Sequence, residues 1–118
     1  MENELIHPTA VIEHGADISD DVSIGPFSYI GSQVTLCSGV KIKSHVVVTG
    51  NTEVGEQTVI YPFSVIGEIP QDLKFSGEKT FLKIGKRNKI RGHVTINTGT
   101  AGGGGLTSIG NDCLFMAG

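Results

Sequence analysis

Hydrophobic residues recur along this chain with a period of six. An aliphatic side chain occupies every sixth position from Ile6 to Ile66, and from Ile12 onward the residue two positions earlier is small or valine. A period of six fits no helix, but it fits short strands joined by turns, because side chains alternate between the two faces of a strand. The aliphatic residue and its small partner are therefore predicted to point inward, and the residue between them outward.

Three such strands would close one triangular coil of 18 residues, and stacked coils would lie about 4.8 Å apart. This arithmetic sorts the inward residues into three columns. Column one is Ile6, Ile24, Ile42 and Ile60; column two is Ile12, Ile30, Val48 and Ile66; column three is Ile18, Leu36 and Val54. We predict an all-β protein, a parallel β-helix of hexapeptide repeats that forms one domain over residues 1–118.

The residues between the inward pairs differ from face to face. Beside column three they are polar, which predicts a solvated face: Asp17, Thr35 and Glu53. Beside column two they form an apolar stripe: Val11, Tyr29, Val47 and Val65. An exposed apolar stripe predicts a contact with another subunit, and the alternative is a cover formed by another part of the same chain.

Two interruptions break the ladder. Asp72 and Glu78 fall on ladder positions that neither can fill, and the pattern resumes at Ile84, so residues 67–83 contain about twelve extra residues. The segment from Ile96 to Ile109 is also too long, by about seven residues on the same arithmetic. Both insertions pass from column two to column three, on successive coils. They should leave from one corner, where we predict a binding site rather than two decorative loops.

Composition and charge narrow the class of protein. The net charge is -3, aromatic residues make up 6% of the chain, and Gly accounts for 17 of 118 residues. The charge is of the wrong sign for nucleic acid or an anionic membrane, and no segment has the length or flanking charges of a membrane span or secretory signal. The two cysteines, Cys37 and Cys113, lie several coils apart and should remain free thiols. We expect a cytoplasmic protein without a membrane span.

Candidates for metal or phosphate chemistry are weak. His45 and His93 both follow column one by three positions, but they should lie two coils, or about 10 Å, apart. One metal ion cannot bridge that distance, which argues against a γ-class carbonic anhydrase, and we predict no metal site and structural or solvated histidines. Gly102–Gly105 lacks the strand, helix and Lys-Ser/Thr of a phosphate loop, so a flexible hairpin tip is the better interpretation.

Several segments carry a resemblance to a known family. HPTAVIEHGA (His7–Ala16), IGPFSYIG (Ile24–Gly31), KSHVVVTGNTEVG (Lys43–Gly55), the QDLK segment at 71–74 and GGGLTSIG (Gly103–Gly110) occur in the expected order. On these the whole chain resembles the N-terminal portion of the acyl-carrier-protein–UDP-N-acetylglucosamine O-acyltransferases of lipid A synthesis. The resemblance implies a left-handed β-helix, no cofactor, and a homotrimer with active sites between subunits.

The resemblance also implies a reaction, in which a 3-hydroxyacyl group moves from acyl carrier protein to the 3-hydroxyl of UDP-N-acetylglucosamine. By the same resemblance Gln71, Asp72 and Lys74 would contact the sugar nucleotide, Asp72 through sugar hydroxyls and Lys74 through a phosphate or sugar oxygen. Met116 would line the acyl pocket. The family's general-base His is expected beyond Gly118, so we assign no catalytic residue and expect this polypeptide alone to be inactive.

The basic residues of the chain are clustered in one segment. Six of the nine Lys and Arg residues fall between 79 and 91, and they form either a docking patch for an acidic carrier protein or a solvated face.

Two features depart from the family's pattern. Asn97–Thr100 stands where many relatives carry a basic residue, and we expect the family's later coils and C-terminal helices to have no counterpart in these residues. The alternatives are a non-catalytic, trimerising β-helix fragment and a hexapeptide acyltransferase with another acceptor, which the QDLK segment argues against.

Overall fold

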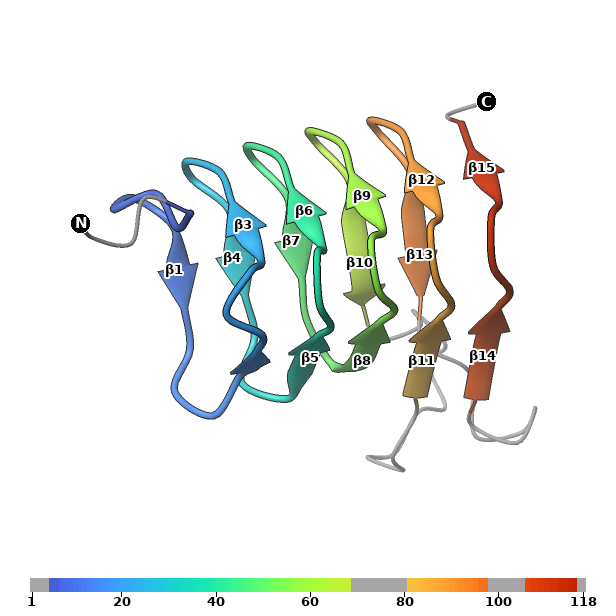
Figure 1. The fold of residues 1–118 in the computed structure, drawn as a ribbon, viewed down its shortest axis with the longest axis horizontal. Helices are drawn as coiled ribbons and strands as arrows, with labels where there is room; N and C mark the ends of the chain where they lie inside the picture. The colour runs from blue at the N-terminus through green and yellow to red at the C-terminus, as the bar shows by residue number, and fades with distance from the viewer. Residues whose placement is uncertain (1–4, 69–80, 98–105, 117–118) are drawn as a thin grey trace, which may run out of the picture.

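The computed structural model describes residues 5–68, 81–97 and 106–116. Their strands stack into a parallel β-helix with three flat faces, each a five-stranded sheet (Figure 1). Face one consists of β3 (Ser23–Ile24), β6 (Lys41–Ile42), β9 (Val59–Ile60), β12 (Lys89–Ile90) and β15 (Leu114–Phe115). Face two consists of β1 (Val11–Ile12), β4 (Tyr29–Ile30), β7 (Val47–Val48), β10 (Val65–Glu68) and β13 (Thr95–Asn97). Face three consists of β2 (Asp17–Ile18), β5 (Val34–Leu36), β8 (Asn51–Val54), β11 (Phe81–Ile84) and β14 (Leu106–Ile109).

The strand register confirms the three predicted columns. On face two Ile30 pairs with Val48, which pairs with Ile66. The columns also continue across both insertions as the arithmetic predicts, and the pairs that show this are Val54 with Ile84, Ile60 with Ile90, Ile66 with Ile96, Ile84 with Ile109 and Ile90 with Phe115. The insertions therefore leave the ladder in phase.

The core is the interior of the prism, where the aliphatic columns are almost fully buried in the middle coils and partly buried in the end coils, as at Ile12 and Ile109. The small residues of the repeat are buried beside them, and their polar atoms bond to the turns. The Ser28 hydroxyl donates to the carbonyl of Lys43 at 2.7 Å and accepts from the Val46 amide at 3.1 Å. Asn88 takes the same inward position as Thr58 on the next coil, donates to the Gly110 carbonyl at 2.7 Å and accepts from the Cys113 amide at 2.7 Å. Each hydrogen bond ties one coil to the next and satisfies a buried polar atom.

Most turns that follow faces one and three have a left-handed residue three positions after the ladder. Seven non-glycine residues of the described chain adopt a positive φ: Phe27, His45, Gln57, Phe63, Arg87, His93 and Asp112. Such a conformation costs an L-residue about 1–2 kcal/mol, so each of these tight turns lowers the stability of the fold slightly. The part of the chain described here contains no helix long and apolar enough to cross a membrane.

Candidate functional site

The two insertions leave the β-helix at one corner. The first lies between the end of β10 at Glu68 and the start of β11 at Phe81, and the second between the end of β13 at Asn97 and the start of β14 at Leu106. Because β10 pairs with β13 and β11 with β14, both insertions bridge face two and face three on adjacent coils (Figure 1). This confirms the predicted corner, which we call the insertion corner. Gln71, Asp72 and Lys74 lie outside the described residues, as does the glycine run 102–105.

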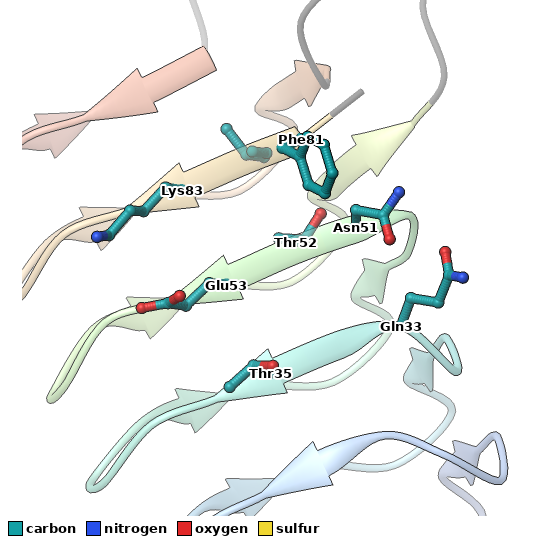
Figure 2. Close-up of a pocket in the computed structure, with 8 residues that line it drawn as sticks. Gln33, Thr35, Asn51, Thr52, Glu53, Phe81 and Lys83 are labelled. Atoms are coloured by element: carbon teal, nitrogen blue, oxygen red, sulfur yellow. The ribbon is translucent and has the colours of Figure 1, made fainter. Parts of the chain in front are cut away.

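A pocket of about 460 Å³ opens on face three beside this corner (Figure 2). Two stacked rows of residues from neighbouring coils form most of its lining. The row three positions before column three is Gln33, Asn51 and Phe81, and the row one position before it is Thr35, Glu53 and Lys83. The sequence interpretation missed this pocket, although the column arithmetic that located the core also aligns these two outward rows.

The pocket presents charged, polar and aromatic side chains together. Phe81 pairs with Asn51 and Lys83 with Glu53 across adjacent strands, so an aromatic ring, an amide, a carboxylate and an ammonium group share one surface. Thr52 lies behind them with its hydroxyl donating to the Thr49 carbonyl at 2.7 Å. Among the described residues, no His or Cys lines the pocket. These groups can hydrogen-bond a polar ligand, and Glu53 and Lys83 are of residue types that general acid–base catalysis also uses.

Met116, the remaining predicted site residue, lies away from this pocket. It follows β15 directly, and the carbonyl of Phe115 accepts a 2.8 Å hydrogen bond from the Arg91 amide. This position places Met116 where face one turns toward face two, at the opposite edge of face two from the insertion corner. Its side chain is 67% exposed. Within one chain, the predicted acyl-site residue and the insertion corner are therefore not brought together.

A column of stacked rings runs along the corner between faces one and two. Phe27, His45, Phe63 and His93 follow one another with ring centroids 5.2, 5.1 and 5.4 Å apart. The ring of Phe63 stands between His45 and His93, so these two imidazoles do not face each other. No group of three or more His, Cys, Asp or Glu residues suited to a metal ion occurs in the described ranges. His45 and His93 therefore contribute to a surface of stacked rings. Their separation by two coils is as predicted.

The cysteines are free thiols, as predicted. Burial raises the pKa of the Cys37 thiol, and the carboxylates of Glu53 and Glu56 raise this pKa further. A thiol whose pKa is raised is a poor nucleophile near neutral pH, because the thiolate is the reactive form. Cys37 therefore has the character of a structural residue.

A parallel β-helix built from hexads, here with two insertions, is the fold of the hexapeptide-repeat class of proteins. The bacterial transferase hexapeptide family (six repeats) matches residues 15–50. Over all 118 residues the chain is 52% identical to the acyl-[acyl-carrier-protein]–UDP-N-acetylglucosamine O-acyltransferase of Rickettsia canadensis and spans 45% of that relative. The chain thus covers about half the length of the curated relatives it matches.

Solved structures agree with this assignment. LpxA from Acinetobacter baumannii superposes with a TM-score of 0.91 at 48% identity, over 94% of this chain and 43% of that one. The UDP-N-acetylglucosamine acyltransferase of Francisella novicida gives a TM-score of 0.91 at 37% identity, over 95% of this chain and 41% of that one. The comparisons confirm the resemblance to the UDP-N-acetylglucosamine O-acyltransferase family and, with it, a left-handed β-helix. This hand is opposite to the usual hand of parallel crossovers.

Proposed function

We propose that this chain is part of an enzyme that transfers a 3-hydroxyacyl group from acyl carrier protein to the 3-hydroxyl of UDP-N-acetylglucosamine, the first step of lipid A synthesis. The observation that supports this proposal best is an alignment that covers the whole chain. Over all 118 residues the chain is 52% identical to a relative named as an acyl-[acyl-carrier-protein]–UDP-N-acetylglucosamine O-acyltransferase. The position of the insertion corner supports it as well, because the QDLK segment belongs to the first insertion.

The reaction requires an attack of the sugar hydroxyl on a thioester carbon. A new C–O bond forms, the C–S bond breaks, and the hydroxyl proton passes through a general base to the departing thiolate, so that the carrier leaves as a free thiol. In our proposal Gln71, Asp72 and Lys74 hold the sugar nucleotide, and Met116 packs against the acyl chain. In this proposal the residues of the chain bind the substrates, and none of them is assigned as the general base.

We further propose that the enzyme is a cytoplasmic homotrimer whose subunits meet on face two. Four of its five outward residues form the stripe of Val11, Tyr29, Val47 and Val65, and the fifth is Thr95. Val11 is 52% exposed. The insertion corner and Met116 lie at the two opposite edges of face two. Packing face two against a neighbour would bring the insertion corner of one subunit toward the Met116 corner of the next. A site completed by two subunits accounts for the separation of these features within one chain.

Binding of the sugar nucleotide tests the proposed function. Calorimetric titration of the chain with UDP-N-acetylglucosamine should show binding, and Asp72→Ala should weaken it by about tenfold, since a lost hydrogen bond to a charged group is worth about 1.5–3 kcal/mol. Glu78→Ala, a carboxylate of the same insertion without an assigned contact, is the control and should bind like the wild type. An absence of binding, or equal losses in both variants, would favour the non-catalytic β-helix alternative.

A further inference from the structure

The basic cluster seen in the sequence does not form one patch. Lys83 lies on face three, opposite Glu53. Lys86 and Arg87 lie in the turn between faces three and one, where Arg87 pairs with Asp112 at 2.8 Å and Lys86 with Glu56 at 3.7 Å. Lys79 is outside the described residues. Of the six, Lys89 and Arg91 are the two that the structure places on face one.

Face one gathers a different set of cations from three consecutive coils. Lys41, Val59 and Lys89 are register partners, so an apolar residue separates two ammonium groups. Two residues further along the same three coils, Tyr61 lies between Lys43 and Arg91. Its ring centroid is 5.8 Å from the Lys43 Nζ and 4.5 Å from the Arg91 Cζ. We call these six residues the basic strip. Val59 and Tyr61 form its centre, and a cation stands at each of its four corners.

The basic strip is not neutralised by carboxylates on its own face. The carboxylate residues whose side chains the structure describes lie on face three or at its two corners: Glu13, Asp17, Asp20, Asp21, Glu53, Glu56 and Asp112. Three of the four at the corner nearest face one are engaged: the Asp21 carboxylate accepts from Ser38 and Gly39, while Glu56 and Asp112 pair with Lys86 and Arg87. A chain of net charge -3 thus carries a positive face.

We propose that the basic strip docks the acyl carrier protein through an acidic surface of that protein. This inference rests on the proposed function, which requires such a donor. An apolar centre with a polar rim is the usual anatomy of a protein interface, and opposite charge on the partner raises the rate of encounter. The strip also borders the predicted acyl site, because Lys89 pairs with Leu114 and Arg91 bonds to Phe115, next to Met116.

The position of the strip is compatible with the trimer. Subunit contacts on face two leave face one accessible, so one surface can assemble the enzyme while the other receives the donor. A carrier protein seated on face one would have the Met116 corner at its edge. Its acyl group could then enter the site from the side opposite the insertion corner, which holds the sugar nucleotide in our proposal.

The test is a binding titration of the chain with apo acyl carrier protein, whose lack of the acyl-bearing arm isolates protein docking from acyl binding. The variant Lys41→Glu with Lys89→Glu should weaken binding at least tenfold, or about 1.4 kcal/mol. The control, Lys83→Glu with Lys86→Glu, changes the net charge equally but lies off the strip, and its Kd should stay within about twofold of the wild type. Wild-type affinity should also fall as salt rises.

Circular dichroism verifies that each variant is folded, and the neutral pair Lys41→Gln with Lys89→Gln, which adds no carboxylates, should show an intermediate loss. Equal weakening of strip and control variants would overturn the inference but leave the proposed function intact. If the wild type binds no carrier protein, both are contradicted. If the strip variants lose binding to phosphatidylglycerol vesicles while carrier binding is unchanged, the strip is a membrane surface and the inference is wrong.

Discussion

Face two and face three share the same inward ladder but present different residues outward. Val48 and Ile66 on face two, and Val54 and Ile84 on face three, are all completely buried. Outward, face two presents Tyr29, Val47 and Val65 in register, whereas face three presents Thr35, Glu53 and Lys83. Alternation within each two- to four-residue strand separates the two roles. The inward position maintains the fold, and the outward position is free to specify a partner or a pocket.

The largest expected effect tests the equivalence of the inward positions. Ile66→Ala on face two and Ile84→Ala on face three should each lower the free energy of unfolding by about 2–5 kcal/mol, because each leaves a cavity in a packed column. Urea denaturation followed by circular dichroism measures both, and the outward substitution Thr35→Ala serves as a control with little change. If one face tolerated the loss and the other did not, the columns would not be equivalent.

The second prediction tests the difference between the outward positions. Val65→Asp should weaken self-association at least tenfold, about 1.4 kcal/mol, because it places a carboxylate in the proposed apolar contact. Lys83→Asp, the same new side chain on face three, should leave the association unchanged. Sedimentation velocity over a range of concentrations distinguishes the two. Unchanged sedimentation of Val65→Asp would remove face two as the subunit contact.

The smallest effect concerns the border of face three. Hydrogen bonding to Arg87 lowers the pKa of Asp112 below its ordinary value of 3.8. A lowered pKa in the folded state stabilises the fold above the ordinary value, and this contribution disappears as the pH falls through the lowered one. Asp112→Asn should therefore reduce Tm slightly at pH 7, and the difference from the wild type should shrink as the pH falls below 3.8 and through the lowered pKa. A difference independent of pH would assign the effect to the turn rather than to the ion pair.

The sequence predicts the interior better than the surface. Column membership depends on period alone, so it carries through both insertions to Ile109 and Phe115. The pocket on face three escaped because it combines residues from three coils at positions that the core pattern ignores. The basic cluster was misleading for a related reason. Residues that are neighbours in the chain lie on different faces of the β-helix. Lys41 and Lys89, far apart in the chain, share face one only because the coils stack, with Val59 between them.

The sequence predicts which residues belong to the site but, for most of them, not where their side chains lie. Gln71, Asp72 and Lys74 follow from a motif in an insertion, and a motif does not place side chains in space. Met116 could be located because it follows a ladder residue, and the ladder fixes the position of each coil. The stacked rings were within reach of the same arithmetic, since Phe27, His45 and Phe63 recur at 18-residue intervals.

The even spacing of the coils has a consequence for how the chain folds. Contacts between adjacent regular coils join residues 18 apart, as between Ser28 and Val46, whereas the insertions lengthen this separation to 30 and 25 residues. Because the entropy cost of closing a loop grows only with the logarithm of its length, the longer of these adds about 0.5 kcal/mol. New segments can thus accumulate at the insertion corner during evolution with little cost in stability, which makes it the place where such a repeat protein can most readily acquire a new specificity.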